Sequence, residues 1–566
     1  MMIGAAPLSA LPLASLRASV INYIRPVTLD DVSMTDTCWL VEVDLYTGSG
    51  ASTRFRPAAL ASGPLAALPL GSRIDAGLTT LRHSDTGWIG EPNDPDRPNV
   101  PYYSRIEKAL QMQREVPVLP EADRRARLSY GKVRYLAGDG ALDTAIARWA
   151  VSRRGVRIYR GRRTVPYASP FGSFVPMFRG VGVGWSGDEL RADLEVRDAS
   201  YRLETPWQQD RYTGTGGPEG TSEWANKPKP FVAGRKRNIQ ADLVDPVHLV
   251  YRFHCREALS VLAARDRGGA LSLTMDYPTY AALIAAPLTT SQYATCLALG
   301  LVRTGGLSPA LRLDVDDDAH GGFAATHGEI ALRALEYAGV TAAELVAGGF
   351  KSLPAGLTGF YWSSAQTPTT AQVMSEIVGS CAGWWGPGRT GLFEVGRLYN
   401  PAVPLLSIDT TNLRGEPTEL PTPGAARWRQ RVAYRVLGTT QQGADLLDTV
   451  TAAERAYYEV GYQVTEAGDP GVLIRDPDAD DPDPLITGFD EEADAKALAA
   501  VLFGLFRAPV RLWRVPVGSH GFLVDLNQPV RLTYPMRGLS GGPIGMVVGQ
   551  DIDDDDVTPT IAIFGQ

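Results

Sequence analysis

Residues 226–240 read NKPKPFVAGRKRNIQ, with five basic residues among fifteen and no acidic residue between them. Pro228 and Pro230 restrict the residues before them to extended backbone, and Gly234 permits a tight bend. The stretch therefore predicts an extended, bent structural segment whose charges pair with acids of a neighbouring subunit or domain. Contact with DNA and a targeting signal are the two alternatives.

The net charge of the whole chain disfavours nucleic-acid binding as its main role. The 566 residues include 55 basic and 63 acidic ones, which gives a net charge of −8 at pH 7. A protein that binds phosphates usually carries a basic surface instead. A hydrophobic content of 44% and a charged content of 21% indicate a folded chain rather than a disordered one. At about 150 residues per domain, the length predicts about four domains.

The cysteines, histidines and acidic clusters indicate neither a metal nor a cofactor. No two cysteines form a CxxC pair and no histidines have H-E-x-x-H spacing, so zinc and redox motifs are disfavoured. Acidic clusters at 314–320, 476–484 and 551–556 lack the Gly and Glu of an EF-hand loop, and we expect solvated turns there. The four cysteines, expected to be isolated and buried, are Cys38, Cys255, Cys296 and Cys381.

No segment of the sequence predicts a membrane span. Pro7 and Pro12 break the apolar N-terminal run, which lacks the basic start of a signal peptide. The most apolar stretch, at 497–506, has about half of the ~18 residues that a span needs. We therefore expect a chain that is made in the cytoplasm and has no stable membrane insertion.

The pattern of strands and turns predicts a β-rich α+β fold with several barrel-like or sandwich-like domains. Runs such as VRIYRG, FVPMFRGVGVGW and LRADLEVRD have the composition and alternation of strands. We divide the chain into four expected parts: an N-terminal β region (1–80) with a hairpin at 38–60; a β-rich, barrel-like unit with one helix (81–270); an insertion (271–410) that contains a compact α+β module (320–400); and a C-terminal α+β domain (411–566) with a helix at 490–507 and terminal strands.

Capping residues predict where helices begin. Asp139 is expected to cap a helix over 139–154 that Gly155 ends. In the α+β module, a Ser or Thr followed three residues later by Glu or Gln marks a helix start. Two such starts are predicted, Thr326 with Glu329 and Thr341 with Glu344, and a third helix is expected to start near Thr369.

An enzyme that cuts cell-wall polymer is one alternative function. Cys381 and His520 have a spacing within the papain-like range, but Cys381 falls at the end of its predicted helix, where the dipole disfavours a thiolate. Ser540 matches G-x-S-x-G without the strand-to-helix context that a nucleophile elbow needs. The G-x-G-x-x-G match at 182–187 precedes a strand pattern, not the helix of a dinucleotide site. We therefore expect no catalytic residues and keep a cysteine peptidase or a carboxylate-pair glycosidase as the alternative.

A carbohydrate-binding adhesin is another alternative, because it needs exposed aromatic side chains. Trp384 and Trp385 are the candidates, although a hairpin beside a helix more often buries such residues. A second basic island at 148–163 holds seven arginines and no acid. Arg157 and Arg160 lie on opposite faces at strand spacing, so ion pairs explain this island at least as well as phosphate contacts.

Short motifs follow one another in a recognisable order: AGDGALD at 137–143, FRG at 178–180, YTGTGGPEG at 212–220, and then KPKPFVAGRKRNIQADLVDP from Lys227. The later chain adds HGEIALRALEYAG, GLFEVGRLYNP and a closing TIAIFG. In this order they resemble the hub or tip proteins of bacteriophage tails, a family of baseplate components in long-tailed phages. Ala137 or Gly138 stands where that family usually has Asn. The residues that carry the match are Asp139, Gly140, Asp143, Tyr212, Gly214, Lys227, Pro228, Lys229, Pro230, Gly234 and Asn238.

The resemblance implies a structural virion protein at the distal end of a phage tail, assembled in the cytoplasm of the bacterial host. It implies self-association into a ring, expected to contain three copies, whose barrel-like domains continue the tail tube. The implied partners are the distal tail or tube protein, the tape measure protein, and tip or fibre proteins. Viral DNA would pass through the ring when it opens, and the segment from Lys227 to Asn238 would be structural.

Overall fold

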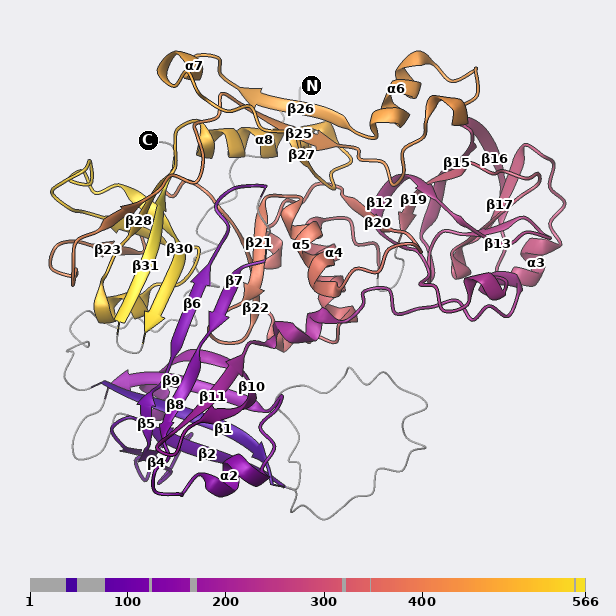
Figure 1. Cartoon of the computed structure of the whole chain (residues 1–566). Coiled ribbons are helices and arrows are strands. Elements are labelled where there is room, and N and C mark those ends of the chain that lie inside the picture. Colours follow the sequence, from indigo (N-terminus) through magenta and orange to yellow (C-terminus); the bar gives the residue numbers. More distant parts are fainter. Residues whose placement is uncertain are drawn as a thin grey trace, which may run out of the picture.

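The computed structural model describes residues 37–47, 77–121, 125–162, 170–317, 322–346, 348–553 and 556–564. Figure 1 shows several β-sheets arranged around a small helical module, with few helices elsewhere. The β-rich α+β class predicted from the sequence is therefore confirmed. None of the helices in this described part is long and apolar enough to cross a membrane.

The N-terminal part forms a nine-stranded sheet in the order β3-β4-β2-β1-β9-β10-β11-β8-β5. In β1, every second residue from Trp39 to Leu45 faces a large apolar core, whereas Leu40 and Glu42 face the other side. Strand β1 pairs with β2, and the second half of the hairpin predicted at 38–60 lies outside the described residues. The strands are β1 (Thr37–Tyr46), β2 (Leu78–Ser84), β3 (Trp88–Ile89), β4 (Pro101–Ser104), β5 (Ile106–Lys108), β8 (Lys132–Leu136), β9 (Gly155–Arg162), β10 (Val175–Gly187) and β11 (Arg191–Arg197).

The helix predicted over 139–154 is much shorter than expected. Helix α2 spans Asp143–Arg148, its N-cap is Leu142, and no side chain caps it, so the prediction that Asp139 caps the helix was wrong. Gly155 begins β9 rather than ending the helix. The reason is tertiary: Ala150 exchanges two backbone hydrogen bonds of 3.0 Å with Tyr46 at the end of β1, which holds the chain extended.

A hairpin from the N-terminal third of the chain completes the C-terminal sheet. Strand β6 (Gln111–Glu115) pairs with β7 (Arg127–Tyr130) on one side and with residues Gly549 to Asp553 of β30 on the other. In Figure 1 this hairpin rises from the N-terminal sheet to the C-terminal one. The C-terminal sheet runs in the order β23 (Leu406–Ile408), β29 (Pro529–Leu532), β30 (Ile544–Asp553), β31 (Asp556–Ile563), β28 (Arg511–Arg514) and β24 (Thr418–Leu420).

A second nine-stranded sheet runs in the order β13-β14-β18-β17-β16-β15-β19-β12-β20. The stretch at 226–240 supplies its strand β12, in which Gly234 has a φ of 71° and Asn238 a φ of 53°. These two bends let β12 pair with β20 in its first half and with β19 further along. The strands are β12 (Phe231–Gln240), β13 (Asp242–Asp245), β14 (Val250–Arg252), β15 (Ser260–Asp266), β16 (Gly269–Asp276), β17 (Gln292–Cys296), β18 (Leu301–Thr304), β19 (Leu311–Asp317) and β20 (Gly359–Trp362).

The compact α+β module lies between the sheets (Figure 1), and two of its three predicted helix starts are confirmed. Helix α4 (His327–Tyr337) begins with a capping box of Thr326 and Glu329, and α5 (Thr370–Gly379) begins at the N-cap Thr369. The box of Thr341 and Glu344 is present but opens only the short 3₁₀ turn η9 (Ala342–Glu344). The predicted closing hairpin is β21 (Gly383–Pro387) with β22 (Phe393–Arg397).

The helix predicted at 490–507 is confirmed as α8 (Glu492–Phe506), which carries Glu492 and Asp494 in its first turn. It packs on a three-stranded sheet in the order β26-β25-β27. The strands of that sheet are β25 (Arg429–Tyr434), β26 (Gln463–Gly468) and β27 (Leu485–Ile486). The other α-helices among the described residues are α3 (Tyr280–Ile284), α6 (Ala452–Val460) and α7 (Val472–Arg475). The remaining 3₁₀ turns are η4 (Phe171–Ser173), η5 (Ala199–Glu204), η6 (Gly217–Glu219), η7 (Ser222–Trp224), η8 (Leu297–Leu299), η10 (Phe350–Ser352), η11 (Gly443–Asp445) and η12 (Gly518–Leu523).

The domain boundaries expected after residues 80, 270 and 410 stay predictions about separate folding units. The sheets continue across all three positions. Residue 80 lies within β2, residue 270 lies within β16, and residue 410 lies between β23 and β24 of one sheet. A unit cut at any of these points would leave strand edges without their partners.

The bend at Gly234 generates the first prediction. A Cβ atom there would meet the Thr358 carbonyl oxygen at 2.1 Å, and its φ of 71° is strained for any L side chain. We expect Gly234→Ala to destabilise the protein by about 2–4 kcal/mol and to lower its melting temperature. Gly184→Ala is the matched control, because a Cβ there has no atom within 4 Å. Equal melting temperatures for the two variants would contradict the account of this bend.

Candidate functional site

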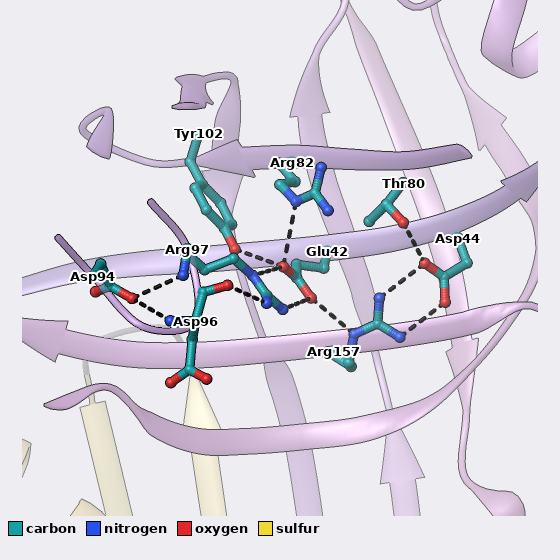
Figure 2. Close-up of polar contacts among 9 residues, drawn as sticks. All are labelled: Glu42, Asp44, Thr80, Arg82, Asp94, Asp96, Arg97, Tyr102 and Arg157. Carbon is teal, nitrogen blue, oxygen red and sulfur yellow. Dashed lines mark hydrogen bonds and ion pairs between the residues drawn. The ribbon is translucent and has the colours of Figure 1, made fainter. Parts of the chain in front are cut away.

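The first candidate site is a buried ionic cluster on the outer face of the N-terminal sheet, shown in Figure 2. We call Glu42 with Arg82, Arg97, Tyr102 and Arg157 the Glu42 cluster. The Glu42 carboxylate is fully buried and accepts hydrogen bonds from Arg97 (2.9 and 3.2 Å), the Tyr102 hydroxyl (2.6 Å) and Arg157 (2.9 Å). Arg82 completes the set at 3.5 Å. Three cations therefore surround one carboxylate.

Arg157 links Glu42 to a second carboxylate on the same strand. Its two terminal nitrogens donate to Asp44 at 2.8 Å each, and the Thr80 hydroxyl donates to Asp44 at 2.7 Å. Because Glu42 and Asp44 are two residues apart in β1, their side chains share one face of the sheet. The ion pairs therefore cross-link β1 with β2 and β9.

The loop that carries Arg97 is fixed by Asp94. The buried Asp94 carboxylate accepts hydrogen bonds from the backbone N–H groups of Asp96, Arg97 and Phe171, at 2.6–2.8 Å. The Arg97 guanidinium also lies 4.6 Å from the centre of the Phe171 ring. Asp94 thus positions Arg97 over Glu42 and ties the loop to the segment before β10.

The electrostatics of the Glu42 cluster favour a permanent ion pair rather than proton transfer. Burial alone raises the pKa of Glu42, but the hydrogen bonds from Arg97, Tyr102 and Arg157 outweigh it and lower the pKa to about 2. Burial and the nearby carboxylate raise the pKa of Tyr102. Neither group changes protonation near neutral pH, so the cluster is suited to holding strands together and not to general acid–base catalysis.

A second buried cluster joins three parts of the molecule. Arg114 of β6 is nearly fully buried and donates to Asp525, to Glu394 of β22 (3.2 Å) and to Gln550 of β30 (3.4 Å). Arg389, in the turn of the β21–β22 hairpin, donates to Asp525 at 3.0 Å and to the Phe522 carbonyl at 3.0 Å. We call these residues the Arg114 cluster. It ties the β6–β7 hairpin, the α+β module and the C-terminal sheet to one another.

The two carboxylates of the Arg114 cluster have opposite pKa shifts. Burial, together with the charge of Asp525, raises the pKa of Glu394. Burial also disfavours the charge of Asp525, but Arg114 and Arg389 outweigh it and lower its pKa. Asp525 is therefore the permanent anion of the cluster.

The basic stretch at 226–240 is held by ion pairs within the chain. Lys229 pairs with Glu219 (2.7 Å), Arg235 with Asp316 (2.6 Å) and Arg237 with Asp490 (2.6 Å). Lys227 lies 4.6 Å from the centre of the Trp224 ring. Lys236 is buried, and burial lowers its pKa to about 8. The stretch therefore presents paired charges, and the pair of Arg237 with Asp490 reaches the segment before α8.

The residues of the tail-protein resemblance fall into two groups, and their role as a family motif stays a prediction. In the first group, Asp139 pairs with Arg105 at 2.6 Å, Gly140 has a φ of 73°, and Asp143 begins α2. In the second, the backbone N–H of Tyr212 donates to the Lys227 carbonyl at 3.0 Å. The other members of the second group lie beside it in the corner before β12 or within that strand: Gly214, Pro228, Lys229, Pro230, Gly234 and Asn238.

The structure places two of the residues considered for catalysis, Cys381 and Ser540. Cys381 is fully buried at the end of α5, and its thiol donates to the Val378 carbonyl at 3.2 Å, as expected for a helix-end thiol. The side chain of His520 lies outside the described residues. Ser540 lies in the loop between β29 and β30, and the G-x-G-x-x-G match falls inside β10. Trp384 and Trp385 are buried, which removes them as an exposed sugar-binding surface.

The acidic clusters and cavities do not form a ligand site among the residues described. No group of three or more potential metal ligands is found there. Asp314 and Asp316 pair with Arg265 and Arg235, while residues 318–320 lie outside the described part. A cavity lined by Trp207, Gln208, Arg256 and their neighbours has about 20 Å³, and a second cavity beside Phe506 has about 10 Å³. Such volumes hold about one water each.

Sequence reasoning missed both ionic clusters. A local signal existed for Glu42, because it is an acid within the otherwise apolar run CWLVEV of β1, and a buried acid requires partners. No local signal existed for Arg114, whose partners Glu394 and Asp525 lie 280 and 411 residues away.

Comparison with known proteins gives low similarity to tail and virion proteins. No protein-family model and no curated protein matches the chain. A chain of the virion of a native gene transfer agent particle is 14% identical with a TM-score of 0.38, over 59% of this chain and 84% of that one. The 43 kDa tail protein of prophage MuSo2 from Shewanella oneidensis is 11% identical with a TM-score of 0.30, over 81% and 93% of the two chains. The tail protein from Neisseria meningitidis MC58 is 8% identical with a TM-score of 0.31, over 80% and 91%.

The Glu42 cluster predicts a large cost for neutralising its carboxylate. Glu42→Gln leaves the surrounding arginines without their shared anion, and we expect a loss of about 3–5 kcal/mol of stability. Glu195→Gln is the control, because Glu195 is half-exposed and pairs with Lys132 at 3.5 Å, so its loss should stay within about 0.5 kcal/mol. Since the folded-state pKa of Glu42 lies below 4.5, its stabilisation is present above pH 4.5 and is lost as the pH falls towards 2. Chemical unfolding of both variants at pH 7 and pH 3 measures this, and similar costs for the two would contradict it.

His327 predicts a second pH dependence, at milder acidity. It is fully buried, its Nε2 lies 2.8 Å from the Ser380 hydroxyl, and its ring packs on Phe489 at 4.8 Å. Burial, helped by the charge of Arg397, lowers the pKa of His327 from 6.5 to about 3. The unfolded chain then binds the extra proton, so the contribution of His327 is complete above pH 6.5 and is lost as the pH falls towards 3.

Between pH 6.5 and 5 the wild type should lose about 2 kcal/mol more stability than His327→Gln. Urea unfolding at the two pH values measures the difference. An equal loss in the wild type and in His327→Gln would show that His327 does not titrate in this way.

Proposed function

We propose that the protein is a structural component of the distal tail of a long-tailed bacteriophage. In this proposal, three copies of the chain form a ring. The ring connects the tail tube to tip proteins or fibres and opens when DNA passes. The order of motifs along the sequence, from the DG turn at Gly140 to the terminal strands, supports this assignment. The protein would assemble in the host cytoplasm and remain in the virion.

The observation that carries a mechanical role is the pairing of β6 with β30. Five residue pairs join a hairpin from the N-terminal third to the penultimate strand of the chain, from Glu115 with Gly549 to Gln111 with Asp553. The Arg114 cluster fixes the same junction with buried ion pairs. Pulling the sheets apart requires breaking these hydrogen bonds and exposing buried charges together, which suits a connector that transmits force.

The charge distribution supports a channel component better than a DNA-binding one. Arg235 and Arg237 of the basic stretch are paired within the chain, and the net charge is −8. Phosphates that meet few available cations release few counterions and are held weakly. DNA would then slide past such a ring without binding to it. The partners proposed are the tail tube or distal tail protein, the tape measure protein, and tip or fibre proteins.

Labelling of phage particles tests this proposal. The chain should be fused to a small tag at its C-terminus in the phage or prophage that encodes it, and the particles should be imaged by negative stain with gold-conjugated antibody to the tag. We expect gold at the end of the tail away from the capsid, and tails that lack their tip when the gene is deleted.

Two results would contradict the proposal. One is gold at the capsid or along the whole tail, with normal tips after deletion. The other is clearing of host cell walls by the purified protein in a zymogram, which would make it an enzyme. Cys381→Ala is the control for the zymogram, because it removes the one cysteine considered as a nucleophile.

A further inference from the structure

The second nine-stranded sheet is open between two of its neighbouring strands. Strands β15 and β16 form a ladder only next to their turn, where residues 264–266 pair with 269–271. Beyond that point β16 leaves β15 and pairs in parallel with β17, while β15 stays on β19. Residues 260–263 and 272–276 are all described, and no ladder joins them. The second half of β16 therefore has a strand edge that faces the opening.

This edge is apolar and unusually exposed. Leu273 and Met275 of β16 have exposed fractions of 51% and 54%, and Leu262 of β15, across the opening, has 46%. Leu273 lies opposite Tyr293, which is buried in the core of the same sheet, so the exposed leucine continues a core face. The stretch 269–275, GALSLTM, contains no charge and no proline. Soluble proteins normally protect edge strands with charged residues or prolines, because an unprotected edge pairs with another chain.

We propose that β16 is an interaction edge at which two copies of this protein pair. The two strands run antiparallel about a two-fold axis through Thr274. Leu273 then lies opposite Met275 of the partner subunit, and Met275 lies opposite Leu273 of the partner subunit, which covers both apolar pairs. Ser272 lies opposite Asp276 of the partner subunit, so a hydroxyl meets a carboxylate and no like charges meet. This self-complementarity favours a second copy of the chain over an unrelated partner.

The proposed contact is separate from the ring proposed above. A two-fold contact is isologous and joins two copies, whereas a ring of three needs a head-to-tail contact elsewhere on the surface. The two proposals therefore predict different masses. The β16 contact alone gives two copies, the ring alone gives three, and both together give six.

Light scattering coupled to size-exclusion chromatography of the full-length protein measures this mass. We expect a multiple of two of the 60.9 kDa chain. Leu273→Lys and Met275→Lys should each halve that mass, because two lysines would face an apolar partner across the axis. Val247→Lys is the control, since Val247 is 82% exposed but lies off this edge, and it should leave the mass unchanged. Circular dichroism of each variant establishes that it is folded.

Each outcome decides the proposal. A mass of one or three copies overturns the β16 contact, and a mass of three copies would remain consistent with the proposed ring. An even mass that neither Leu273→Lys nor Met275→Lys changes also overturns it. An even mass that both variants halve, and that Val247→Lys keeps, supports it.

A cross-link tests the register. In an antiparallel pair centred on Thr274, the two Cα atoms are about 4.5–5.5 Å apart, within the range that a disulfide bridges. Thr274→Cys should therefore give a disulfide-linked dimer on a non-reducing gel after mild oxidation. Val247→Cys and the wild type, which keeps its four native cysteines, are the controls. A dimer band that is no stronger in Thr274→Cys than in Val247→Cys overturns the proposed register.

Discussion

The pairing of β6 with β30 is the constraint on which the rest of the architecture depends. A strand from the N-terminal third lies beside the penultimate strand of the chain, so the C-terminal sheet is incomplete without the N-terminal part. The Arg114 cluster sits at this junction and adds contacts to Glu394 of the α+β module. The β6–β7 hairpin therefore helps to fix the N-terminal sheet, the module and the C-terminal sheet to one another (Figure 1), and Phe522, Ile552 and Val557 add direct packing on the core of the N-terminal sheet.

Two buried carboxylates in distant parts of the molecule have the same structural role. Glu42 and Asp525 are each surrounded by guanidinium groups that lower their pKa, and each joins segments that are far apart in the sequence. An apolar contact would tolerate small shifts, whereas a buried carboxylate is satisfied only when its donors are in place. Such clusters therefore specify which segments meet, beyond the stability that they supply. This precision is consistent with the mechanical role proposed above.

The sequence predicted the features that depend on local chemistry. The capping box at Thr326 begins a helix, a second helix begins at Thr369, the Trp384 hairpin is buried, and strands follow the helix predicted at 490–507. The predictions that failed are those that depend on tertiary contacts. Helix α2 stops early because Ala150 is captured by the end of β1. The sequence also separated regions that the sheets join, since strand pairing between residues hundreds of positions apart has no local pattern. The same reason hides the Arg114 cluster, whereas Glu42 could have been found as an acid in an apolar strand.

The long-range pairing at Arg114 also has a consequence for biosynthesis. Arg114 and its partner Gln550 are 436 residues apart, and a ribosome adds about 5–20 residues each second. The outer edge of β6 therefore waits about 20–90 seconds for the strand that covers it. During that interval the nascent chain presents an unpaired β-edge, which is where aggregation or capture by a chaperone begins. The edge of β6 is thus protected only once residues 549–553 have been made.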